Sequence, residues 1–305
     1  MTRVLCPVCS NNGYEKQFSG KDYRCGTSNE VFDVAKCQAC GFLFVTNPPD
    51  LKDLGKYYPE NYYIDETDPV KGKPKRGFGS KKVSLAMKFR SDGKVLDIGC
   101  GDGDFLQKMQ GSGFDVYGLD VSAKAVEITK AKLGLDGSSD RICNAELKDC
   151  GFKPEQFNLV TMWHVLEHVY NPREILQEIK RVLGQDGILV IEVPNVNSLG
   201  YRIFGKYCFH MEIPRHVSHY SISTLVKLLD LEGFTVRKAE YPRFTFPLSP
   251  FYSLSMMLKD KGTPSVLKTF LLLLASPVLI ILIVFCNIFP FFGDDMVVYA
   301  EKRRG

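Results

Sequence analysis

The sequence predicts an α/β protein whose mainly parallel sheet is preceded by a cysteine-rich unit and interrupted near its end by an apolar helical insertion. From Lys94 onward, short apolar runs alternate with helical patterns, which is typical of a parallel sheet covered on both faces. Two Cys-x-x-Cys pairs lie within residues 1–45, and no charged residue occurs within 269–293. A length of 305 residues accommodates one complete α/β domain with these appendages.

The composition narrows the class of protein further. A net charge of +4 gives no argument for nucleic acid, so we expect no nucleic-acid partner. The first ten residues, MTRVLCPVCS, lack the apolar core of a secretory signal, which favours a cytoplasmic chain with reduced thiols. In such a chain, closely spaced cysteine pairs favour metal binding over disulfide bonds.

The first unit, residues 1–45, is predicted to be a zinc ribbon. Two-residue spacing lets each cysteine pair grip one metal ion from a tight turn, so two pairs complete a tetrahedral site. The predicted ligands are Cys6, Cys9, Cys37 and Cys40. Short alternating segments at 31–35 and 42–45 fit a β-ribbon around the metal. Redox-active or free thiols are the alternative, and Cys25 receives no role.

Residues 46–93 are predicted to form a linker with a lead-in helix at about 81–89. An aromatic-rich run at 57–63 serves either for packing between two domains or as a substrate lid, and the sequence leaves both open. The basic, glycine-rich run at 71–82 is typical of a mobile surface loop.

The stretch VLDIGCGDGDFL at 95–106 predicts a buried strand, a glycine turn and a helix start. Gly99, Gly101 and Gly103 permit the positive φ angles and the close backbone approach that a large cofactor requires. The free N–H groups of the helix start face the same space. Glycines at alternate positions do not match the dinucleotide-binding fingerprint, which has two residues between its second and third glycines.

The second predicted strand, at 116–119, ends in Asp120. A carboxylate in that position can accept hydrogen bonds from both ribose hydroxyls of a nucleoside cofactor. A helix at 122–133 follows, with Ser122 as its N-cap, and a short third strand is expected at 141–143.

Together these motifs resemble class I S-adenosylmethionine (SAM) dependent methyltransferases, in which an acidic residue, here Asp97, precedes G-x-G-x-G. The resemblance implies a Rossmann-like seven-stranded sheet with an antiparallel last strand, SAM as the cofactor, and an adenine lined by the residues after the third strand. The residues that it places around SAM are Asp97, Gly99, Cys100, Gly101, Gly103, Asp120, Val121, Asn144, Ala145, Glu146, Trp163 and His164.

The fourth predicted strand, at 157–162, runs into the sequence WHVLEH. H-x-x-E-H is also a zinc-protease signature, but that role requires the motif inside a helix, whereas here it follows a strand. The segment resembles a motif of the ubiquinone-biosynthesis O-methyltransferases, some of which carry E-x-x-E-H tied to a divalent cation. Because His164 replaces the first glutamate, we expect Glu167 and His168 to cap and brace the next helix rather than to bind a cation.

The core domain is predicted to comprise residues 94–241 plus 296–302, and its remaining part resembles the same family. Its remaining elements are predicted as helices at 173–183 and 222–232, strands at 188–193 and 235–240, and an antiparallel strand at 296–301.

An irregular segment at 197–220 contains a Pro-Arg-His run that resembles zinc-ribbon methyltransferases, a group that includes enzymes of surface-polysaccharide pathways. It is expected over the carboxyl ends of the strands, where Arg215 and its neighbouring histidines can meet the acceptor. His216 is the first candidate for a general base and His164 the second. The alternative for His216 is a hydrogen bond to the backbone.

The insertion at 242–295 contains the uncharged run 269–293, which is long enough for a transmembrane helix. Its flanking strands pair in one sheet, so both ends lie on the same side of a membrane. Pro277 predicts a bend that divides the run into two helices of about a dozen residues. We therefore expect a re-entrant or interfacial hairpin at the cytoplasmic leaflet, with a buried helical pair or a dimer interface as alternatives.

Basic residues on both sides of the insertion suit an anionic membrane surface. These are Lys259, Lys261, Lys268, Lys302, Arg303 and Arg304. The expected location is the cytoplasm, at the inner face of the membrane.

The expected function is SAM-dependent O-methylation of a glycan or lipid-linked small molecule by direct displacement, with positioning as the main contribution to rate. A quinone-like lipid is the alternative acceptor. A non-catalytic, SAM-binding membrane adaptor is the alternative of another class. The sequence does not determine the oligomeric state.

Overall fold

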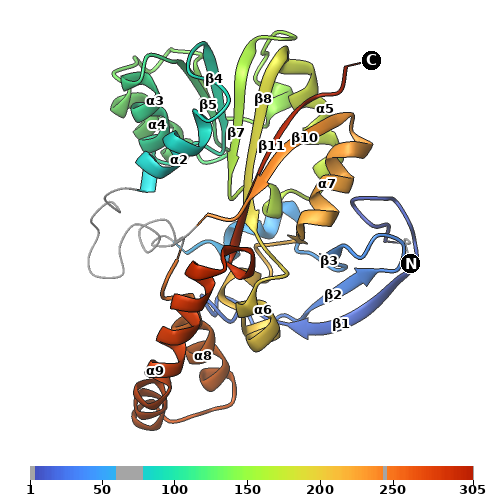
Figure 1. The fold of residues 1–305 in the computed structure, drawn as a ribbon, viewed down its shortest axis with the longest axis vertical. Coiled ribbons are helices and arrows are strands. Elements are labelled where there is room, and N and C mark those ends of the chain that lie inside the picture. The colour runs from blue at the N-terminus through green and yellow to red at the C-terminus, as the bar shows by residue number, and fades with distance from the viewer. Residues whose placement is uncertain (1–3, 60–77, 243–245, 305) are drawn as a thin grey trace.

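The computed structural model describes residues 4–59, 78–242 and 246–304, which Figure 1 colours from blue to red along the chain. Most of the predicted 57–63 aromatic run and part of the 71–82 run lie outside these residues. The described chain forms a seven-stranded sheet in the order β10-β11-β8-β7-β4-β5-β6 and a four-stranded sheet in the order β1-β2-β3-β9.

The large sheet is mainly parallel, as predicted. Its strands are β4 (Lys94–Ile98), β5 (Asp115–Leu119), β6 (Ile142–Cys143), β7 (Phe157–Trp163), β8 (Leu183–Pro194), β10 (Phe234–Glu240) and β11 (Asp295–Lys302). β4 pairs in parallel with β5 and β7, β7 pairs in parallel with β8, and β11 lies antiparallel between β8 and β10. This confirms the seven-stranded class I methyltransferase sheet with an antiparallel last strand.

Helices cover both faces of this sheet. On one side lie α2 (Phe78–Ala86), α3 (Asp104–Gly111) and α4 (Ala123–Lys132), and on the other lie α5 (Pro172–Val182) and α7 (Ile222–Leu231). Alternate strand residues face the two layers: Val95 packs with the α3 side, whereas Leu96 packs with the α5 side. Buried parallel strands expose neither face to water, which explains their continuous apolar runs.

Local signals explain several helix boundaries. Ser122 caps α4, because its hydroxyl accepts a hydrogen bond from Ala125 N at 3.3 Å. Pro172 begins α5 at a position where no amide donor is needed. The lead-in helix begins earlier than predicted, at Phe78, and β8 begins directly at Leu183 instead of after a loop.

The cysteine-rich unit forms the second sheet together with a strand from the other half of the chain. β1 (Tyr14–Gly20), β2 (Phe32–Cys37) and β3 (Leu43–Val45) are antiparallel, and β3 also pairs with β9 (Ser218–His219). One face of this sheet packs through Phe42 and Phe44 into the same core as α5 and α7. The unit is therefore built into the core of the protein.

The insertion forms a helical hairpin of α8 (Ser249–Asp260) and α9 (Ser265–Ile288), which projects from the lower end of the sheet in Figure 1. The predicted division of the apolar run at Pro277 is wrong, because α9 continues through that residue. Proline removes the amide donor to the carbonyl four residues earlier. The Ser276 hydroxyl donates instead to that carbonyl, Leu273 O, at 2.7 Å, so the acceptor keeps a partner.

The basic residues after the insertion do not lie beside the hairpin, which corrects that part of the prediction. β11 starts next to the hairpin and runs away from it, so Lys302, Arg303 and Arg304 lie at the opposite end of the sheet. Arg303 forms an ion pair with Asp230 there.

Candidate active site

The glycine turn between β4 and α3 leaves an open space at the carboxyl edge of the sheet. Gly99, Gly101 and Gly103 have φ angles of +72°, +56° and +74°. A Cβ atom added at Gly99 would lie 2.5 Å from Val165, whereas one added at Gly101 would meet no atom within 4 Å. Position 99 therefore requires glycine because a side chain there would clash with Val165. At position 101 the space beside the backbone is open, so a cofactor can approach the main chain closely.

Asp97 lies beneath this turn, buried at the end of β4. Its carboxylate accepts a hydrogen bond from the Thr161 hydroxyl at 2.6 Å. Burial raises the pKa of Asp97 to about 7, although the Thr161 hydroxyl and the ammonium group of Lys82 oppose the shift. A nearby positive charge would therefore favour the ionised form of Asp97, the acid predicted from the motif.

Asp120 follows β5 and braces the turn from the other side. Its two carboxylate oxygens accept hydrogen bonds from Gly101 N at 3.0 Å and Ser122 N at 2.8 Å. Val121 is exposed beside it. Each oxygen keeps a further acceptor site for a ribose hydroxyl, so the predicted role fits this geometry.

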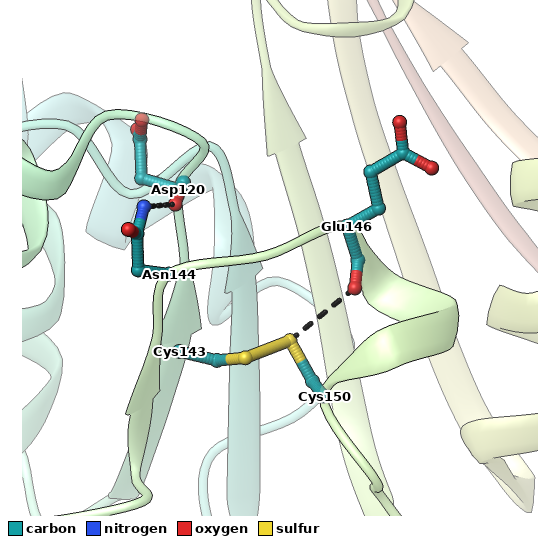
Figure 2. The surroundings of a disulfide bond; sticks show 5 residues. All are labelled: Asp120, Cys143, Asn144, Glu146 and Cys150. Carbon is teal, nitrogen blue, oxygen red and sulfur yellow. Dashed lines mark hydrogen bonds between the residues drawn. A yellow bond between two sulfur atoms is a disulfide. The ribbon is translucent and has the colours of Figure 1, made fainter.

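The loop after β6 is tied to Asp120 and closed by a disulfide bond. Figure 2 shows that Asn144 points to Asp120, whose main-chain oxygen accepts a hydrogen bond from the Asn144 amide at 3.0 Å. Cys143 and Cys150 form a disulfide that encloses Asn144, Ala145 and Glu146. This disulfide corrects the expectation of reduced thiols, and the sequence analysis assigns no role to the pair.

Trp163 and His164 end β7 on the same edge. The buried Trp163 ring packs edge-to-face against Phe105 at 5.3 Å, and the Lys82 ammonium lies 5.5 Å from its centroid. The motif that begins here is not part of an α-helix, because a short 3₁₀ turn, Leu166–His168, follows the strand. This geometry agrees with the rejection of a zinc-protease motif.

His164 lies among carboxylates. Its Nδ1 is 3.3 Å from Glu167 Oε1, and its Nε2 is 3.8 Å from Glu192 Oε2 and 4.0 Å from Asp295 Oδ1. Burial alone would lower the pKa of His164, but the carboxylates of Asp295, Glu167 and Glu192 raise it to about 10. A ring that already holds its proton at neutral pH cannot accept another, which argues against His164 as a general base.

His216 is buried behind this cluster, with 6% of its surface exposed. Its Nδ1 donates to the carbonyl oxygen of His210 at 2.9 Å in the neutral tautomer, which leaves Nε2 as an acceptor. Burial and the neighbouring His168 lower the pKa of His216 well below its usual value. The backbone bond expected as the alternative is present, and the base role remains a prediction.

Arg215 does not face an acceptor, contrary to the prediction. Its guanidinium is fully buried and donates to Asp22 Oδ1 at 2.7 Å and to Glu212 Oε1 at 2.8 Å. His219 pairs in the ribbon sheet as part of β9 and is also buried. The Pro-Arg-His segment therefore joins the ribbon to the core.

Glu167, His168 and His216 offer one ligand atom each within 4.8 Å of one another, so the bracing residues also have the geometry of a cation site. The His168 Nδ1 lies 3.0 Å from Arg215 O and 3.2 Å from the Tyr58 hydroxyl. These contacts join the end of β7 to Tyr58 of the linker and to the Pro-Arg-His segment. They do not reach the next helix, α5, which has no side-chain cap in the described part of the chain, so the expected capping of that helix is not observed.

The four ribbon cysteines converge on one point. Cys6 Sγ lies 3.6 Å from Cys40 Sγ, and Cys9 Sγ lies 3.5 Å from Cys37 Sγ. Four thiolates at about 2.3 Å from a tetrahedral zinc ion stand about 3.8 Å apart. The cluster therefore fits such an ion. Cys25, by contrast, lies outside it.

The sheet order, the glycine cradle and the two carboxylates at its edge define a class I SAM-dependent methyltransferase. The family model described as a methyltransferase domain matches residues 75–239, which is more than half of the chain. This chain belongs to that methyltransferase domain family.

Known relatives carry methyltransferase names, and a solved structure shares the fold. The ubiquinone biosynthesis O-methyltransferase of Glaesserella parasuis is 35% identical over 117 residues, covering 36% of this chain and 49% of that protein. That of Thiobacillus denitrificans is 32% identical over 131 residues, covering 42% and 56%. The chain thus spans about half the length of the curated relatives it matches. A SAM-dependent methyltransferase from Thermotoga maritima shares the fold, with a TM-score of 0.50, 15% identity, and coverage of 83% of this chain and 97% of that one.

Sequence reasoning missed part of the acidic cluster beside His164. Glu192 lies in the otherwise apolar strand β8, and Asp295 begins β11; both are buried. A carboxylate inside a run such as ILVIEV could have indicated a functional or paired residue, because acidic side chains are rarely buried in a strand unless they are paired.

Proposed function

We propose that this methyltransferase transfers the methyl group of SAM to a hydroxyl of a lipid-carried small molecule at a membrane surface. The observation that carries the proposal is the direct connection between α9 and the candidate active site. Only residues 289–294 separate α9 from Asp295, and Asn195 Nδ2 holds this connection by donating to Gly293 O at 3.1 Å.

The membrane part of the proposal is supported by the exposed surface of α9. This helix is the one described segment long and apolar enough to cross a membrane. At about 1.5 Å per residue its 24 residues extend about 36 Å, compared with a hydrocarbon core of about 30 Å. Leu279 packs against the protein, but large apolar side chains on the other faces are exposed. They include Phe270, Leu273, Leu274, Val278, Ile281, Val284 and Ile288.

An interfacial orientation fits better than a span. The side of α9 that carries Leu279 is occupied by the protein, and α8 returns beside it to the ribbon, where Asp260 pairs with Lys21. Lys259, Lys261 and Lys268 lie at this end of the hairpin and suit anionic headgroups. We therefore place α9 along the cytoplasmic face of the membrane.

Two head groups remain candidates for the acceptor. A sugar hydroxyl follows from the resemblance to zinc-ribbon methyltransferases of polysaccharide pathways. A phenolic, quinone-like ring follows from the names of the relatives, which match about half of their length here. In either case a lipid tail would rest near α9 while its head reaches the sheet edge.

Four features of the chain would support the transfer. SAM, when bound, supplies an electrophilic methyl group for direct displacement by the acceptor oxygen. Gly101 and Asp120 hold the nucleoside portion, and Asp97 places negative charge beneath the turn. His216 Nε2 is the proton acceptor that we propose for the hydroxyl, and positioning contributes most of the rate. Four thiolates of the ribbon would bind a structural zinc ion, which would couple metal binding to folding.

The acceptor is tested with radiolabelled SAM, the purified enzyme and lipid extracts of the source cell. We expect label in a lipid fraction, and acid hydrolysis then separates a methylated sugar from a methylated phenol. The Asp120→Asn variant should require more SAM for half-maximal labelling, whereas His216→Ala should lower turnover with little change in SAM affinity. Label confined to water-soluble products would contradict the lipid-carried acceptor.

Membrane binding is tested by flotation with vesicles containing anionic phospholipid. The double substitution Leu274→Lys and Ile281→Lys should abolish flotation, because each adds a charge to the exposed side of α9. The matched control is Leu231→Lys, which changes an exposed leucine on α7, away from the hairpin. Equal flotation of all three proteins, or of none, would contradict the proposed orientation.

A further inference from the structure

Three neighbouring strands bring a second group of metal-binding side chains to the sheet edge, separate from the four cysteines. His164 follows β7, Glu192 lies in β8 and Asp295 begins β11, and these strands are adjacent. The register places Trp163 opposite Glu192, and Glu192 opposite Val297, two residues after Asp295. Each of the three residues offers one ligand atom, and these atoms all lie within 4.8 Å of one another.

Two oxygens of this group lack a hydrogen-bond partner in the described structure. They are Glu192 Oε2 and Asp295 Oδ1, and each belongs to a residue with only 2% of its surface exposed. Buried polar atoms are satisfied in the great majority of cases, so two adjacent exceptions require an explanation. Lys81 and Lys82 interact electrostatically with Glu192 but do not donate to its unpartnered oxygen.

One ion can contact all three ligand atoms after small side-chain movements. His164 Nε2 lies 3.8 Å from Glu192 Oε2 and 4.0 Å from Asp295 Oδ1. Metal bonds to histidine and carboxylate ligands measure about 2.0–2.2 Å, so two ligands of the same ion stand at most about 4.4 Å apart. The side chain of His164 is 29% exposed, which leaves a path for the ion from solvent.

We propose that His164, Glu192 and Asp295 bind a divalent first-row metal cation, such as Mn²⁺ or Zn²⁺, which replaces the Nε2 proton of His164 and releases it to solvent. One imidazole and two carboxylates suit such an ion and leave coordination positions for water or another oxygen ligand. The ion would hold the acceptor oxygen next to the methyl donor and favour its deprotonated form. Binding of the ion does not depend on which acceptor is used; only this role rests on the proposed function.

The site differs from the one implied by the resemblance. In the resemblance, the cation is tied to Glu167 and His168, which here belong to the neighbouring group with His216. Two of the ligands proposed here, Glu192 and Asp295, lie on strands outside that motif. Glu167 Oε1 contacts His164 Nδ1 at 3.3 Å, so it would orient the ligand ring from behind.

The test uses the full-length protein loaded with a single equivalent of zinc, which the four ribbon thiolates are expected to take, and electron paramagnetic resonance of free Mn²⁺. We expect one equivalent of Mn²⁺ to lose its aqueous signal, and Glu192→Gln and Asp295→Asn each to weaken binding at least tenfold. The control Glu301→Gln removes a carboxylate from the same strand β11, where it pairs with Arg237, and should bind normally. His164→Gln provides a third ligand variant if either carboxylate variant fails to fold.

Three results would overturn the site: no Mn²⁺ bound by the wild type, binding unchanged in the ligand variants, or binding lost only in Glu167→Gln. The same titration separates this inference from the proposed function. If Mn²⁺ binding depends on Glu192 but no lipid is methylated, the proposed metal site stands and the proposed lipid-carried acceptor is wrong. If a lipid is methylated but no Mn²⁺ binds, the proposed acceptor stands and the proposed metal site is wrong.

Discussion

Replacing Arg215 with methionine tests whether the Pro-Arg-His segment joins the ribbon to the core. The guanidinium is fully buried and donates to Asp22 twice, at 2.7 and 3.2 Å, to Glu212 at 2.8 Å and to Tyr57 O at 2.7 Å. Methionine preserves much of the volume but removes every donor. Breaking a buried ion pair from one side costs about 3–5 kcal/mol, because the partner carboxylate stays buried.

The structure places the expected loss at the lower end of that range. Asp22 retains donors from Cys25 N, Thr27 N and the Thr27 hydroxyl, and Glu212 retains Arg24. We therefore expect the free energy of unfolding to fall by about 3 kcal/mol. A second substitution, Asp22→Asn, should restore part of this loss by removing the uncompensated charge.

Urea unfolding followed by fluorescence of the single tryptophan, Trp163, measures this loss. The matched control is Arg141→Met, whose side chain is 41% exposed and pairs with Asp115, itself 35% exposed, so its loss should stay below about 1 kcal/mol. Equal losses in the two variants, or a loss below about 1 kcal/mol for Arg215→Met, would refute the reasoning.

Three further predictions concern the cofactor edge. The folded-state pKa of Asp97 is raised from 3.8 to about 7, so the stabilising effect of this carboxyl group is complete below pH 3.8 and is lost as the pH rises to 7. Over that window the free energy of unfolding of Asp97→Asn should rise by up to about 4 kcal/mol relative to wild type. Unfolding curves at several pH values measure this difference. Gly103→Ala should cost about 1–3 kcal/mol, since the added Cβ lies 2.8 Å from helix α4 at a φ of +74°, whereas Gly101→Ala should weaken SAM binding in calorimetry with a smaller loss of stability. Reducing the Cys143–Cys150 bond opens an eight-residue ring and should lower stability by about 2.5 kcal/mol on chain entropy; unchanged melting with reductant would contradict this.

The sequence predicts the large sheet well because its signals are local. Apolar runs, the glycines after Asp97 and the acid at 120 each follow from a few adjacent residues, and the structure places them at one edge. Ser122 likewise caps its own helix. Motif order supplies the topology.

What the sequence did not reveal depends on distant contacts. Arg215 looked like an acceptor contact, but its partner Asp22 lies 193 residues earlier in the chain. Pro277 predicted a bend, because a proline alone does not show that the neighbouring Ser276 hydroxyl will serve the freed carbonyl. The acidic cluster arises only when β7, β8 and β11 lie side by side.

The pairing of β3 with β9 has a consequence for synthesis of the chain on the ribosome. The ribbon emerges first, but its sheet lacks a fourth strand until residues 218–219 have been translated. At about 5–20 residues per second, that delay is on the order of ten to thirty seconds. During this interval Phe42 and Phe44 have no core to enter. The amino-terminal unit must therefore complete its folding late, together with the half of the protein made last.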